Sequence, residues 1–154
     1  MSDIQIQVSA TINASPDLIY AILSDYREGH VAILPKKYFT GITVLEGGQG
    51  EGTIIDIHMQ VMGVEQELQL EVSEPEPGRV LVERDQAAGI LTTFTVDPME
   101  DGKSSRVTIA TQAKASPGLR GWIEKLVNPV IVRRIYKEEL QQLADYVHTK
   151  MHPQ

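Results

Sequence analysis

The sequence of 154 residues contains no cysteine. This absence excludes thiolate nucleophiles, cysteine-ligated zinc, iron–sulfur clusters and disulfide frameworks. Basic residues are also scarce, because 14 Lys and Arg stand against 21 Asp and Glu and leave a formal net charge of −7. Proteins that bind nucleic-acid phosphates need a basic face, so this net negative charge argues against a nucleic-acid partner.

Long hydrophobic runs are missing as well. No apolar segment approaches the ~20 residues that span a bilayer, so we expect no stable membrane insertion. The first residues have neither the basic segment nor the apolar stretch of a signal peptide. We therefore expect a cytoplasmic protein, a monomer or homodimer, whose residues 1–154 form a single domain with an ordered core over about 3–149.

Familiar catalytic and nucleotide-binding motifs are absent too. The sequence has no Gly-x-Ser-x-Gly elbow, and its four histidines show no spacing that suggests a catalytic triad. Gly48, Gly50 and Gly52 precede a strand pattern rather than a helix, so we interpret them as a hairpin turn and not a phosphate cradle. His148 and His152 have helical metal-ligand spacing but no acidic third ligand nearby, so we expect no metal site.

What the sequence does contain is a regular order of secondary-structure signals. Strict apolar–polar alternation over 3–13 predicts a strand. Ser15 and Pro16 are typical of a helix start, and a second short helical stretch over 27–34 ends at Pro35. Turn residues then separate strands predicted near 39–46, 51–61, 64–73, 79–85, 90–97 and 104–114. A long helix is predicted from residue 116 to about 149, with a kink at Pro129.

The hairpin centred on residues 62–63 provides an internal check. With a two-residue loop, one of its faces is almost wholly apolar and carries Ile55, Ile57, Met59, Gln66, Leu68 and Leu70. On the other face His58 lies opposite Glu67, which we interpret as a solvated cross-strand charge pair rather than a catalytic group. A sheet built on this register has one buried face.

Turns this close together favour antiparallel neighbours, because parallel strands need long crossovers. A sheet with one apolar face must be covered, and the only long apolar element left is the C-terminal helix. The sequence therefore predicts an α+β fold in which a seven-stranded curved antiparallel sheet wraps around the long C-terminal helix. Two short helices lie between its first and second strands.

Several segments that punctuate this order carry a family resemblance across about residues 3–149. They are Ala14-Ser15-Pro16-Asp17, Ser24-Asp25-Tyr26, residues 29–35, residues 47–53, residues 74–83 and the closing amphipathic helix. Together they resemble the START/Bet v 1-like (SRPBCC) superfamily with its helix-grip fold, and within it the polyketide cyclase/dehydrase-like branch. The resemblance implies a hydrophobic cavity between sheet and helix, with no obligate metal or cofactor. Members range from lipid carriers to aromatic cyclases, so it specifies a fold more than an activity.

Polar residues on otherwise apolar faces are the candidates for orienting a ligand inside such a cavity. Arg84 shares strand parity with Val80 and Val82, and Arg133 falls near the apolar stripe of the long helix, where it either snorkels to solvent or meets a ligand carboxylate. Phe94 and Trp122 are core or pocket wall. The complete candidate set is Ile55, Ile57, Met59, Gln66, Leu68, Leu70, Arg84, Thr92, Phe94, Thr111, Trp122, Leu126, Arg133 and Tyr136.

His30 has two interpretations that the sequence leaves open. It either caps a helix C-terminus, where a cation is favoured, or contributes to a cavity wall. No pattern in the sequence places a carboxylate beside it.

Three functions from different classes remain. We favour binding or transport of a hydrophobic or amphipathic small molecule, lipid-like or aromatic and polyketide-like, because no catalytic set is recognisable. The alternative, implied mainly by the resemblance, is a cyclase or dehydratase without metal or nucleotide, with Arg84, Arg133 and Tyr136 as its first candidate residues. A protein-interaction module is a second alternative, to which the acidic charge gives only loose support.

Overall fold

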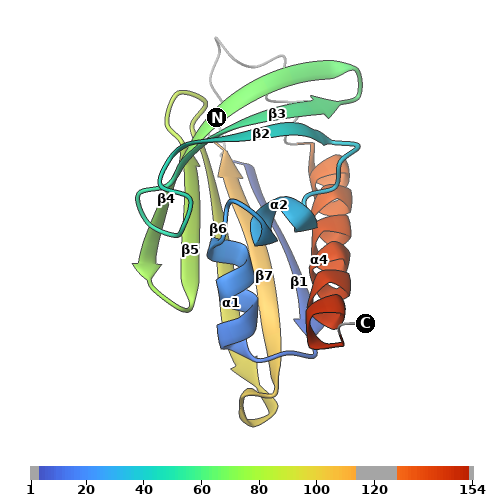
Figure 1. Cartoon of the computed structure of the whole chain (residues 1–154). Helices are drawn as coiled ribbons and strands as arrows, with labels where there is room; N and C mark the ends of the chain where they lie inside the picture. Colours follow the sequence, from blue (N-terminus) through green and yellow to red (C-terminus); the bar gives the residue numbers. More distant parts are fainter. Residues whose placement is uncertain (1–3, 114–127, 153–154) are drawn as a thin grey trace.

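The computed structural model describes residues 4–113 and 128–152. Within these ranges, seven strands form one antiparallel sheet in the order β1-β7-β6-β5-β4-β3-β2. Figure 1 shows this sheet curving around α1, α2 and α4. The strands are β1 (Ile4–Ile12), β2 (Phe39–Glu46), β3 (Ile54–Val61), β4 (Val64–Glu76), β5 (Val80–Asp85), β6 (Ile90–Met99) and β7 (Ser104–Ala113). The predicted α+β fold, with a curved sheet around a long C-terminal helix, is confirmed.

The two short helices are α1 (Pro16–Ser24) and α2 (Gly29–Ile33). As predicted, Ser15 caps α1: its hydroxyl accepts a hydrogen bond from the Leu18 amide at 3.3 Å, and Pro16 occupies the first turn. The second helix is shorter than predicted, because the Asp25 carboxylate accepts hydrogen bonds from backbone amides of the intervening turn. Gly29 allows the backbone of α2 to approach α1 closely, since a Cβ at this position would lie 2.5 Å from the Ile22 carbonyl oxygen. This contact places the next residue, His30, against α1.

The predicted β3–β4 register is confirmed, with Ile57 opposite Leu68 and Val61 opposite Val64. Met62 and Gly63 both adopt positive φ, at 52° and 78°, as the commonest two-residue hairpin turn requires. On the outer face the ring nitrogen Nε2 of His58 lies 3.5 Å from a Glu67 carboxylate oxygen, and both side chains are more than half exposed. The apolar face of this hairpin therefore lies on the concave side of the sheet.

The C-terminal helix α4 (Pro129–Met151) begins at the proline that we expected inside a longer helix. The predicted kink at Pro129 is wrong, because the Asn128 side chain caps the helix and accepts from the Val130 amide at 3.0 Å. Proline suits this first position, where its missing N–H leaves no helical hydrogen bond unmade. Residues 116–127 of the predicted helix lie outside the described residues. The buried face of α4, which packs near β1 and α2, consists of Val132, Ile135, Glu139, Leu140, Leu143 and Val147.

Candidate functional site

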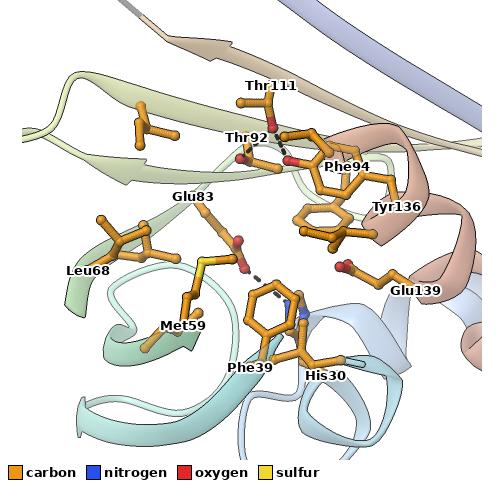
Figure 2. A pocket seen from close by; sticks show the side chains of 16 residues that line it. His30, Phe39, Met59, Leu68, Glu83, Thr92, Phe94, Thr111, Tyr136 and Glu139 are labelled. Atoms are coloured by element: carbon orange, nitrogen blue, oxygen red, sulfur yellow. Dashed lines mark hydrogen bonds and ion pairs between the residues drawn. The ribbon is translucent and has the colours of Figure 1, made fainter. Parts of the chain in front are cut away.

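A pocket lies between the concave face of the sheet, α2 and α4 (Figure 2). Its walls are mostly apolar, and its cavity volume is about 80 Å³. An engineered apolar cavity of ~150 Å³ holds one benzene ring, so this conformation has less room than a single-ring site. The lining residues are His30, Leu34, Phe39, Ile57, Met59, Leu68, Leu70, Glu83, Ile90, Thr92, Phe94, Thr111, Val132, Ile135, Tyr136 and Glu139.

The structure brings together about half of the residues that the sequence suggested for a cavity. Ile55 is fully buried in the core but does not line the pocket. Gln66 is partly exposed and lies in a separate surface hollow beside Thr40 and His58. Trp122 and Leu126 lie outside the described residues. The candidates that do line the pocket are Ile57, Met59, Leu68, Leu70, Thr92, Phe94, Thr111 and Tyr136.

The two arginine candidates are exposed and do not reach the pocket. The parity assigned to β5 was wrong: Leu81 and Glu83 face the concave side, and Arg84 lies on the other face opposite Glu71. Val-Leu-Val at the start of β5 is apolar on both faces, so alternation alone does not distinguish them. Arg133 falls one position past the buried Val132, which turns it to solvent.

Glu83 instead forms a buried hydrogen-bonded group with two residues from the α1–α2 region. Its carboxylate oxygen Oε2 accepts a hydrogen bond from the Tyr26 hydroxyl at 2.7 Å and lies 3.2 Å from Nε2 of His30. The rings of Tyr26 and His30 stack with centroids 4.4 Å apart, and Phe94 meets the imidazole edge to face. Burial first, and then the charge and hydrogen bond of Glu83, raise the pKa of Tyr26 well above its usual value.

The proton positions in this group follow from its partners. Nδ1 of His30 lies 2.7 Å from the Leu23 carbonyl oxygen, which can only accept, so Nδ1 carries a proton. A second proton is then required between Nε2 and Glu83, because two lone pairs would otherwise face each other. His30 thus combines both interpretations left open by the sequence: it binds a carbonyl near the end of α1, and it lines the cavity.

Glu139 of α4 is the second acidic residue of the pocket. Only 2% of it is exposed, and its oxygen Oε2 has no hydrogen-bond partner among the described residues. Figure 2 shows its carboxyl group pointing from the helix into the pocket, on the side of His30. Burial first, and then the negative charge of Glu83, raise the pKa of Glu139 well above its usual value. This carboxyl group is therefore neutral over a wider pH range than an ordinary glutamic acid.

A third polar group lies farther along the pocket. The hydroxyl of Tyr136 is hydrogen-bonded to that of Thr111, which lies 2.9 Å from the hydroxyl of Thr92. Loss of water around the Tyr136 hydroxyl raises its pKa to about 12, so it remains a neutral donor at physiological pH. Hydroxyls from β6, β7 and α4 thus form a chain on one wall (Figure 2).

Sequence reasoning missed Glu83 and Glu139. The signal for Glu139 was present, since it follows Tyr136 by three residues and directly precedes Leu140 on the apolar stripe. The signal for Glu83 was its shared parity with Leu81. The other lining residues outside the predicted set are Leu34, Phe39, Ile90, Val132 and Ile135, together with His30.

Two further site types find no support in the part of the chain that the structure describes. In residues 4–113 and 128–152, no three His, Asp or Glu side chains gather in a way that could hold a metal ion. None of the helices described there combines the length and hydropathy needed to cross a bilayer.

Comparison with protein families gives a match over nearly the whole chain. The sequence model of the family described as polyketide cyclase/dehydrase and lipid transport matches residues 3–148. No curated protein matches the chain in sequence.

Several solved structures share the fold. The solution structure of the KanY protein is 30% identical, covers 96% of this chain and 99% of its own, and superposes with a TM-score of 0.81. The Zhui aromatase/cyclase from Streptomyces sp. R1128 is 15% identical, with coverages of 99% and 98% and a TM-score of 0.75. A START superfamily protein from Mycobacterium smegmatis is also 15% identical, with coverages of 95% and 95% and a TM-score of 0.62.

Proposed function

The chain belongs to the polyketide cyclase/dehydrase and lipid transport family, and we propose that it binds an apolar or amphipathic small molecule between its sheet and α4. The observation that carries this proposal is the pocket itself: apolar walls with a few inward-facing polar groups are typical of small-molecule sites. The polar groups come from α2, β5, β6, β7 and α4, so they can orient a ligand from several sides.

The size of the pocket limits what this conformation accepts. With a cavity volume of about 80 Å³, a single aromatic ring already requires the wall side chains to move apart. A lipid or a polycyclic polyketide requires a larger displacement of α4 or of the arched β2–β4 strands. We therefore expect ring-sized compounds to bind first, and larger ligands to bind only with a measurable change of conformation.

This proposal can be tested with two valine substitutions on one helix. Val132 lines the pocket, whereas Val130 lies two residues earlier and is 65% exposed. We expect Val132→Phe to fill the cavity and to weaken toluene binding by at least about tenfold. Nuclear magnetic resonance titration with toluene measures this binding. Val130→Phe adds the same ring outside the pocket and is expected to leave toluene binding unchanged. Native mass spectrometry of gently purified protein, with organic extraction, would identify any hydrophobic passenger.

Circular dichroism and a thermal melt establish that both variants fold, and Val132→Met is the milder replacement where the phenylalanine overpacks the core. The proposal is rejected if the purified parent protein carries no hydrophobic small molecule and does not bind toluene. It also fails where Val130→Phe and Val132→Phe weaken binding equally.

A cyclase or dehydratase activity is the second candidate, and the buried His30–Glu83 pair favours it. The pair holds one transferable proton at the pocket wall, and such groups supply general acid–base catalysis. The similarity to the Zhui aromatase/cyclase agrees with this candidate, although at 15% identity it extends to the fold alone.

A single-ring β-hydroxy ketone, 4-hydroxy-4-phenylbutan-2-one, is a suitable test substrate for this activity. Its dehydration removes a proton from the carbon beside the carbonyl, expels the hydroxyl as water after protonation, and gives a conjugated enone that absorbs in the ultraviolet. We expect His30→Gln to lower the rate by about 10²-fold or more, with the exposed His58→Gln as the control. A parent protein that does not exceed the buffer rate excludes this candidate.

A further inference from the structure

The acidic and basic side chains that line the pocket lie in one region. The titratable lining groups there are His30 from α2, Glu83 from β5 and Glu139 from α4, and none of the described lining residues is Lys or Arg. Glu83 already accepts from the Tyr26 hydroxyl and contacts His30. Glu139 differs, because its buried oxygen Oε2 has no partner within the described chain and its carboxyl group points into the cavity (Figure 2).

The protonation of Glu139 determines what it can offer to a ligand. Burial and the neighbouring Glu83 raise its pKa, so the group is a neutral carboxylic acid under conditions where surface glutamates are charged. A neutral carboxyl group donates one hydrogen bond through its O–H. A buried donor without an acceptor costs free energy, and a ligand oxygen placed there would remove that cost.

Charged ligands fit this region poorly. An anionic ligand would find no Lys or Arg side chain among the described lining residues, and the imidazole of His30 is already paired with Glu83. An ammonium group would have to leave water and ionise Glu139, and such buried ion pairs often gain no net stability. An uncharged ligand with a carbonyl oxygen avoids both costs, because the carbonyl accepts the hydrogen bond and the remainder contacts apolar walls.

We propose that Glu139 is the specificity-determining residue of this pocket, and that its carboxyl group donates a hydrogen bond to the carbonyl oxygen of an uncharged, ring-sized apolar ligand. This inference rests on the proposed ligand-binding function and names the ligand class. It also assigns a role to a buried acidic residue that packing against α2 and the sheet does not require. An apolar side chain of similar size at position 139 would fill the same space without a buried polar group.

Four probes of similar size test the proposal: acetophenone, ethylbenzene, benzoate and benzylamine. In the parent protein we expect acetophenone to bind about tenfold more tightly than ethylbenzene, which lacks only the acceptor. Glu139→Leu keeps the bulk and removes the donor, so it should bind the two probes equally. Glu138→Gln is the matched control, because its side chain is next along α4, pairs with Lys37 and does not line the pocket.

The infrared carbonyl stretch of bound acetophenone gives a readout that packing alone does not move. We expect this frequency to be lowered in the parent and in Glu138→Gln, and to return toward its value in hydrocarbon solvent in Glu139→Leu. Equal binding of acetophenone and ethylbenzene by the parent overturns the inference while the binding function stands. Tightest binding of benzylamine or benzoate, or a preference that survives in Glu139→Leu, also overturns it. Binding of none of the four probes rejects both proposals.

Discussion

Glu83→Ala is expected to lower the free energy of unfolding by ~3–5 kcal/mol, the usual cost of removing one partner from a buried ion pair. The carboxylate of Glu83 binds the Tyr26 hydroxyl at 2.7 Å and lies 3.2 Å from His30 Nε2. Tyr26 and His30 are 0% and 1% exposed, so both are shielded from bulk water in the parent and lose a buried partner in the variant. Urea denaturation at pH 7, followed by circular dichroism, measures the change.

Glu83→Gln is the matched control for this prediction. Tyr26 and His30 both contact the oxygen Oε2 of Glu83. An amide oxygen at that position can still accept from Tyr26, so only the contact with His30 is weakened, and we expect a loss of about 1–2 kcal/mol. The double variant Tyr26→Phe with Glu83→Ala should lose less than the sum of the single variants, because the two groups share one hydrogen bond. A loss below about 1 kcal/mol in Glu83→Ala would show that the three side chains do not stabilise one another.

The fold could be predicted because its signals are local and repeat along the chain. The alternation in β1, the Ser15-Pro16 helix start and the self-consistent register around Met62-Gly63 each depend on a few neighbouring residues. The error at Pro129 has the same origin. Proline within a helical pattern is compatible with either a kink or a first turn, and the capping side chain of Asn128 decides between them.

The sequence predicted the apolar wall of the site and the hydroxyl residues Thr92, Thr111 and Tyr136, but not the acidic residues. Ile57, Met59, Leu68 and Leu70 follow from the pairing of one hairpin. The ionisable groups come from elements far apart in the sequence, since residue 83 follows residue 30 by 53 positions. Neither periodicity nor spacing relates such positions, and the apolar residues on both faces of β5 made Arg84 a better candidate than Glu83. Arginine on a strand with an ambiguous inner face is therefore weak support for a ligand site.

The second large effect concerns the pH dependence of stability at Glu139. Its folded-state pKa is raised above the ordinary value of 4.5 by burial and by the charge of Glu83. A group with a raised folded-state pKa contributes its full stabilisation of the folded protein at pH values below its unfolded-state pKa. This contribution is lost as the pH rises toward the folded-state pKa. Between those two values the parent should lose about 1.4 kcal/mol of stability per pH unit. Glu139→Gln, which cannot ionise, should lack this loss and be more stable than the parent at pH 8.

The difference between Glu139→Gln and the parent should shrink as the pH is lowered to 4.5, where the carboxyl group is neutral in the folded parent and half protonated in the unfolded chain. Asp145→Asn makes the same carboxylate-to-amide change on an exposed position of α4, and we expect no comparable gain there. Guanidinium denaturation curves at pH 4.5, 6 and 8 provide the comparison. Because the charge of Glu83 contributes to the raised pKa, the pH range of the loss should narrow when Glu83→Gln is the background. A parent that is equally stable at pH 4.5 and 8, with no gain from Glu139→Gln, would mean that water reaches the carboxyl group and that it is ionised in the folded protein.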